Sequence, residues 1–114
     1  MEVVFFSTED GTEPAREFLD SLDIKMRAKV VRAIELLQNN GEKLREPHSK
    51  HIRDGIFELR VKFSSDISRI LYFFFDGGTA VLTNGFIKKT NRTPPREFDR
   101  AKRYRNEYIT RRRK

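Results

Sequence analysis

Four basic side chains are the residues best placed for chemistry in this 114-residue sequence. Arg60 and Lys62 occur in one segment that alternates apolar and polar residues, and Arg69 and Lys88 occur in the two apolar segments that follow. Like charges that face each other across strands destabilise a sheet unless water, an acidic side chain or a bound anion compensates them. A guanidinium matches two phosphate oxygens and Lys adds a point charge. The pattern therefore indicates either a phosphate-binding face or a solvated sheet face.

The predicted turns set a register that brings these cations together. If residues 63 and 68 close the first hairpin, Lys62 lies opposite Arg69 and Arg60 lies diagonal to it. A two-residue Gly-Gly turn in the second hairpin places Phe86 opposite Arg69 and puts Lys88 on the same face. An exposed aromatic ring on such a face can stack on an RNA base. A slip of one residue would move each strand's set to the other face.

Candidates for proton transfer are few. Cations beside a developing phosphorane lower the barrier to phosphodiester cleavage without a metal. Glu58 shares the predicted cationic face, as a general base or as a partner that orients Arg60. His48 and His51 fall in a predicted loop, where solvated surface histidines are common. The sequence has no cysteine, no Walker loop, no nucleophile elbow and no histidine spacing typical of a metal site, so we expect no cofactor and no metal.

The segments around these residues predict one α+β domain. The expected elements are a strand at 2–6, helices at about 13–22 and 23–40, a loop at 42–55, strands at 56–63, 68–75 and 79–88, and a helix from 93 to about 109. Their order is β-α-α-β-β-β-α, which predicts a small antiparallel sheet with an N-terminal αα-hairpin and a C-terminal helix. Residues 1–110 are expected to form the domain and residues 111–114 a basic tail.

Positive charge is concentrated in the last quarter of the chain. The net charge is +7, with 24 basic and 17 acidic residues. Residues 86–114 hold 12 of the basic and 3 of the acidic side chains, which leaves 24 − 12 = 12 basic and 17 − 3 = 14 acidic residues before them. This asymmetry indicates a polyanionic partner, either a nucleic acid or an acidic protein. The absence of cysteine fits a reducing cytoplasm, and no segment approaches the ~20 apolar residues of a membrane span.

Three motifs resemble the RelE/ParE toxin superfamily, and most closely its HigB-like, phage-derived branch. They are GIFELRV at 55–61, SRILYFF at 68–74 and NGFIKKTNRTP at 84–94. The two preceding helices and the final helix also fit, so the resemblance covers about residues 1–110. The chain departs from the family pattern at Ser68, which replaces a Tyr, and at Asn84, which replaces a His. If that His transfers a proton in relatives, another group must do so here.

The resemblance implies a toxin of a type II toxin–antitoxin system. Such toxins are typically ribosome-dependent, metal-independent mRNA endoribonucleases of the cytoplasm that inhibit translation. The implied partners are the ribosome, mRNA and a cognate antitoxin, a helix-turn-helix protein of the HigA type. In the implied reaction the RNA 2′-hydroxyl attacks the adjacent phosphate.

The matching motif positions make Arg60, Arg69 and Lys88 the catalytic candidates. Candidates for RNA or ribosome binding are Lys62, Phe86, Lys89, Arg92, Arg96 and Arg103. Two alternatives stay open: a ParE-like inhibitor of DNA gyrase, because one fold serves both functions, and a non-catalytic nucleic-acid-binding module.

Overall fold

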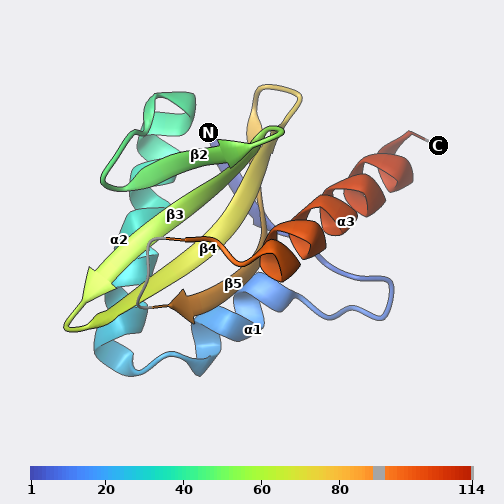
Figure 1. Ribbon diagram of the computed structural model, residues 1–114. Helices are drawn as coiled ribbons and strands as arrows, with labels where there is room; N and C mark the ends of the chain where they lie inside the picture. Colours follow the sequence, from blue (N-terminus) through green and yellow to red (C-terminus); the bar gives the residue numbers. More distant parts are fainter. Residues whose placement is uncertain (89–91, 114) are drawn as a thin grey trace.

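The computed structural model describes residues 1–88 and 92–113, and in these it has a five-stranded sheet with helices on both faces (Figure 1). The elements are β1 (Glu2–Phe5), α1 (Pro14–Ser21), α2 (Ile24–Asn40), the 3₁₀ helix η1 (Gly41–Lys43), β2 (Ser49–Arg53), β3 (Ile56–Phe63), β4 (Asp66–Phe75), β5 (Thr79–Lys88) and α3 (Pro95–Arg112). The predicted α+β class is confirmed, as are the N-terminal pair of helices and the C-terminal helix. None of the described helices is long and apolar enough to cross a membrane.

The sheet differs from the predicted one in two ways. Its strand order is β1-β5-β4-β3-β2, and β1 pairs with β5 in parallel, so the sheet is mixed rather than fully antiparallel. The predicted loop at 42–55 contains an additional strand, β2, which pairs antiparallel with β3. The polar sequence SKHIR hides this strand, because its stability comes from backbone pairing and from a buried hydroxyl contact between Ser49 and Tyr72.

Two separate cores hold the helices on opposite faces of the sheet. On one face α2 packs Val30 and Leu37 against a cluster that includes Leu59 of β3. On the other face α3 packs Phe98 and Tyr108 against residues of β4 and β5. The two helices therefore leave no fully solvated sheet face, and a polar group in the middle of the sheet is covered by a helix.

The predicted boundaries of α2 are confirmed. The Asp23 carboxylate accepts hydrogen bonds from the backbone N–H groups of Lys25 and Met26, both at 3.0 Å, which satisfies two of the unpaired donors at a helix start. Gly41 ends the helix with a φ of +55°, a conformation that costs glycine little.

The register between β3 and β4 differs from the predicted one by two residues. Arg60, not Lys62, lies opposite Arg69. The turn is the two-residue pair Ser64-Ser65, in which Ser64 has a φ of +58°, and β4 therefore begins at Asp66. Because the shift is an even number, every side chain keeps the predicted face.

The register between β4 and β5 is confirmed where it matters for the cations. Arg69 pairs with Phe86, and Ile67 with Lys88. The hairpin itself closes one residue earlier than predicted, with Phe75 opposite Thr79. A bulge at Thr83 of β5, opposite the step from Leu71 to Tyr72, restores the register. The bulge thus compensates for the longer turn.

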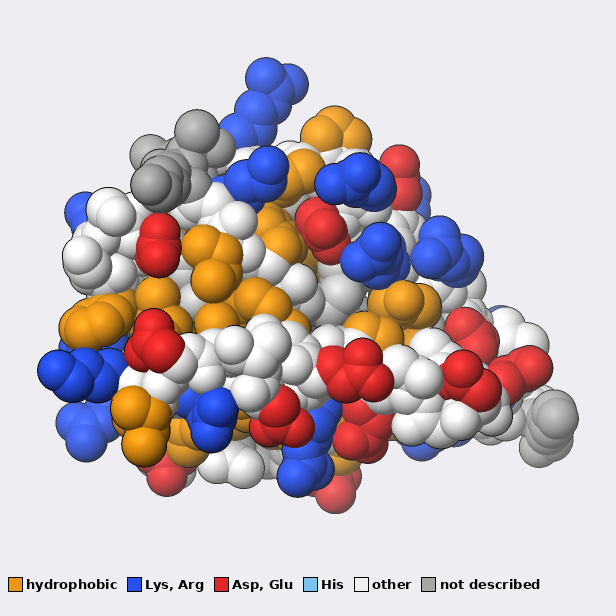
Figure 2. All heavy atoms as spheres, turned by 90° about the horizontal axis from the view of Figure 1, so that it is seen from below, with side chains coloured by type: hydrophobic (Ala, Val, Ile, Leu, Met, Phe, Trp, Pro, Cys, Tyr) orange, Lys and Arg blue, Asp and Glu red, His pale blue; other side chains and the backbone are white. Residues whose placement is uncertain are grey.

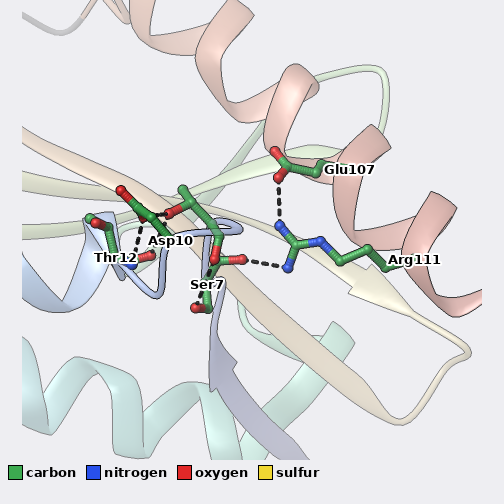
Figure 3. A network of polar contacts seen from close by, with 6 residues as sticks. Ser7, Asp10, Thr12, Glu107 and Arg111 are labelled. Carbon is green, nitrogen blue, oxygen red and sulfur yellow. Dashed lines mark hydrogen bonds and ion pairs between the residues drawn. The ribbon is translucent and has the colours of Figure 1, made fainter.

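The C-terminal half of α3 is tied to the loop that follows β1 (Figure 3). The Arg111 guanidinium donates to the Ser7 carbonyl at 2.7 Å and to the Glu107 carboxylate at 2.5 Å. In the same loop, hydrogen bonds from Thr8 and Thr12 lower the pKa of Asp10 to about 2. The helix continues through Arg112, past its predicted end near residue 109, so the basic end of the chain begins inside α3.

Gly85 allows α1 to lie directly against β5. A Cβ atom at this position would come within 2.2 Å of Phe18 Cδ2. We expect Gly85→Ala to lower the free energy of unfolding by about 1–3 kcal/mol, the usual cost of overpacking a core. Urea denaturation of the purified protein measures this cost. Gly78→Ala is the control, because a Cβ there meets no described atom within 4 Å, and an equal loss in both variants would contradict the explanation.

Candidate functional site

A buried carboxylate of β3 lies between one arginine of β3 and one of the central strand, β4. Glu58 Oε1 accepts a hydrogen bond from Arg60 Nε at 2.6 Å and lies 3.5 Å from Arg69 Nη1. Glu58 Oε2 accepts a hydrogen bond from the Thr93 hydroxyl at 2.7 Å. We refer to Glu58, Arg60, Arg69 and Thr93 as the Glu58 cluster. Its three ionised side chains carry a net charge of +1.

The strand register explains why the cluster forms. Arg60 lies directly opposite Arg69, a cross-strand pair of like charges that destabilises a sheet by itself. Glu58 is two residues before Arg60 on β3, so its side chain leaves the sheet on the same face. The carboxylate can therefore contact both guanidinium groups. The sequence-based hypothesis that Glu58 orients Arg60 agrees with this contact.

Arg69 is the most deeply buried cation in the part of the chain that the structure describes. Its side chain has 0% exposed surface, as does that of Glu58. Burial lowers the pKa of the Arg69 guanidinium, and the nearby charge of Arg60 lowers it further, whereas the Glu58 carboxylate opposes both effects. A ligand in solvent has no direct access to Arg69 in this conformation.

Arg60 is the arginine of the cluster that reaches solvent. Its side chain is 17% exposed and leaves β3 on the α3 side of the sheet, as those of Glu58 and Arg69 do. Residue Arg60 also belongs to the lining of a groove of about 460 Å³ between α2 and β3. Lys62 lines the same groove and is exposed. The Glu58 cluster thus holds the Arg60 guanidinium where solvent can reach it and keeps the Arg69 guanidinium buried.

The remaining predicted site residues are distributed over a wider surface. Lys88, Arg92, Arg96 and Arg103 are exposed. Figure 2 shows basic side chains gathered over α3, the helix that carries two of these residues. Lys89 lies outside the described residues. Among the described residues, no group of three His, Asp or Glu side chains is arranged to hold a metal ion.

Phe86 does not present its ring to solvent. It is 8% exposed and belongs to the core formed with Phe98 and Tyr108 of α3. The predicted position opposite Arg69 is confirmed, but the ring supports the helix in this conformation.

Two residues that hold the site together, Asn84 and Thr93, make contacts that were not predicted from the sequence. The Asn84 side-chain amide donates to the backbone carbonyl of Glu97 at 3.2 Å and to its carboxylate at 3.0 Å, which fastens the start of α3 to β5. Thr93 was predicted to open the last helix, yet its hydroxyl binds Glu58, and the N-cap residue is Pro94. A Thr before two prolines signals a helix start, whereas a partner 35 residues away leaves no local pattern.

Comparison with known proteins agrees with the motifs. A family described as phage derived protein Gp49-like (DUF891) matches residues 17–106, which include α2, the whole β2–β5 region and the first two thirds of α3. A search of curated proteins finds no match. Because the family match spans most of the sequence, the chain belongs to the phage-derived Gp49-like family, which is a RelE-like toxin family.

Proposed function

We propose that the chain is a HigB-like toxin that cleaves mRNA on the ribosome, in the cytoplasm and without a metal. Membership of the Gp49-like family, which is associated with toxins of toxin–antitoxin systems, supports the toxin assignment and implies an antitoxin partner. The observation that carries the enzymatic part is Arg60, a partly exposed guanidinium held at 2.6 Å by a buried carboxylate. A cation that is fixed before the substrate binds stabilises a developing charge without reorganisation.

The proposed reaction is an internal transfer at phosphorus. The 2′-hydroxyl oxygen of the RNA forms a bond to the adjacent phosphorus, and the bond from phosphorus to the 5′-oxygen of the next nucleotide breaks. The 2′-hydroxyl proton leaves to a base, and the 5′-oxygen takes up a proton. Negative charge grows on the non-bridging phosphate oxygens, and Arg60 donates hydrogen bonds to them.

We assign Arg69 and Glu58 as positioning residues. Both side chains are fully buried, and both act on Arg60: Glu58 by a direct hydrogen bond and Arg69 by sharing the same carboxylate oxygen. The sequence-based hypothesis assigned Arg69 a contact with the phosphate. It left undecided whether Glu58 is a general base or a partner that orients Arg60. Burial favours the positioning role for each in the described conformation.

The exposed cations are proposed to bind the RNA backbone and the ribosome. Lys88 follows the cluster on the same sheet face and is the candidate for assisting Arg60. Lys62, Lys89, Arg92, Arg96 and Arg103 are proposed to attract RNA through charge. Phe86 is proposed to keep α3 in place rather than to stack on a base, because its ring is part of the α3 core.

Arg60→Ala is expected to lower mRNA cleavage by about 100-fold or more, the usual cost of losing one preorganised donor to a transition state. Arg60→Lys is expected to recover only part of the rate, because Lys lacks the fork of donors. Primer extension on mRNA from a translating extract measures the new 5′ ends. Lys43→Ala, an exposed charge change in η1, is the control.

Two results would contradict this prediction. Full cleavage by the Arg60→Ala variant would remove Arg60 from the mechanism. Intact mRNA together with a loss of DNA supercoiling in cells that express the unmodified chain would favour the gyrase alternative, and intact mRNA with RNA binding would favour a non-catalytic module.

Glu58→Gln is expected to destabilise the protein by about 3–5 kcal/mol, because it removes the carboxylate charge that contacts two adjacent arginines, one of them fully buried. Urea denaturation measures the loss, and Glu35→Gln at an exposed position of α2 is the control. At a temperature where the Glu58→Gln variant is folded, we expect a lower kcat with little change in KM. An unchanged kcat would leave Glu58 with a purely structural role.

A further inference from the structure

Lys50 is a cation beside the candidate site, in a segment that the sequence predicts to be a loop. The structure places it in β2, the last strand of the sheet, directly opposite Glu58 of β3 (Figure 1). Side chains of directly opposed residues leave a sheet on the same face. Ile52, two residues after Lys50, packs against the α3 core, as does Leu71, which lies opposite Glu58 on β4. Lys50 therefore leaves the sheet on the α3 side, together with the Glu58 cluster.

The Lys50 side chain is accessible to an anion from solvent. Lys50 is exposed, and none of the ion pairs within residues 1–88 and 92–113 includes it. The carboxylate directly opposite, that of Glu58, already contacts Arg60, Arg69 and Thr93. The Lys50 ammonium group is thus left to a partner from outside the described part of the chain.

Lys50 and Arg60 occupy diagonal positions on neighbouring strands. Lys50 lies opposite Glu58, and Arg60 is two residues further along β3 on the same face. Residues in this relation are about 7–8 Å apart, which is within reach of long side chains. An ammonium group and a guanidinium group that start from these positions can contact one phosphate group from two sides.

The negative charge at the phosphate grows during the proposed reaction. A phosphodiester carries a single negative charge, and the phosphorane gains a second one when the 2′-hydroxyl proton leaves. Glu58 contributes −1 and the two arginines +2, so the net charge of +1 on the Glu58 cluster balances only the first of these charges. A further cation at the non-bridging oxygens would stabilise the transition state more than the bound RNA.

We infer that Lys50 is a further catalytic residue, which contacts the non-bridging phosphate oxygens beside Arg60 and balances the second negative charge of the transition state. The inference rests on the proposed function, because it adds a residue to the same reaction. The bonds that form and break are those of that reaction, and Lys50 keeps its proton throughout. Lys62 lies on the other side of Arg60 along β3, where it lines the groove beside α2, and keeps its proposed part in attracting RNA.

Cleavage kinetics on ribosomes programmed with a defined mRNA test this inference. Lys50→Gln removes the charge and is expected to lower kcat at least about tenfold while KM changes less than about twofold, because the lost interaction is made in the transition state. Lys50→Arg is expected to retain most of kcat, since it keeps the positive charge. Lys62→Gln is the comparison and is expected to raise KM instead. Lys43→Gln, an exposed charge change in η1, is the control and is expected to change neither constant.

Urea denaturation of the same variants distinguishes a catalytic role from a structural one. Lys50 is exposed on an edge strand, so we expect Lys50→Gln and Lys50→Arg to unfold at the urea concentration that unfolds the unmodified chain. A loss of kcat in Lys50→Gln that came with a lower urea midpoint, and that Lys50→Arg did not repair, would give Lys50 a structural role and overturn the inference.

The other outcomes separate this inference from the proposed function. Cleavage by the unmodified chain with an unchanged kcat in Lys50→Gln would overturn the inference and leave the proposed function in place. A higher KM in both Lys50→Gln and Lys62→Gln, without a loss of kcat, would make Lys50 one more cation that attracts RNA and would also overturn it. An unmodified chain that binds ribosomes but cleaves no mRNA would overturn the proposed activity and, with it, the role of Lys50.

Discussion

The repulsion between Arg60 and Arg69 across β3 and β4 is the constraint on which the site depends. Two guanidinium groups in register on a covered sheet face are unfavourable without a counter-charge. Glu58 supplies it from two residues away, and the carboxylate gains hydrogen bonds from Arg60 and Thr93 in return. A buried ion pair adds little net stability by itself, because the cost of removing both charges from water offsets much of their attraction. Its effect here is to fix where each arginine lies.

The rest of the fold maintains this arrangement from three directions. The bulge in β5 restores the register that brings Phe86 opposite Arg69. Asn84 fastens the start of α3 to β5, and Thr93, just before that helix, closes the cluster through Glu58. At the other end, Arg111 anchors α3 to the loop after β1. A helix whose outer face is rich in arginine is thus held in place by apolar packing and by hydrogen bonds at its ends, several of which involve a charged group.

The sequence predicts the elements of this structure better than it predicts their contacts. Apolar periodicity, the Asp23 cap and the terminal glycine define α2, because each signal is local. β2 has no such signal, since its polar residues gain stability from pairing with a strand that follows it. The face of each cation was predicted correctly because the error in register was an even number of residues. Burial of Arg69 was not predictable, because it depends on α3, whose position depends on contacts such as the one from Asn84 to Glu97.

The positive charge of the chain therefore divides by environment rather than by position in the sequence. The Arg60 side chain is 17% exposed and the Arg69 side chain 0%, although the two residues face each other across one pair of strands. A buried arginine adds to the net charge but offers no contact to a polyanion, whereas a partly exposed one held by a carboxylate does both. Lys62, two residues after Arg60 on β3, is exposed and is also one of the residues that line the groove beside α2.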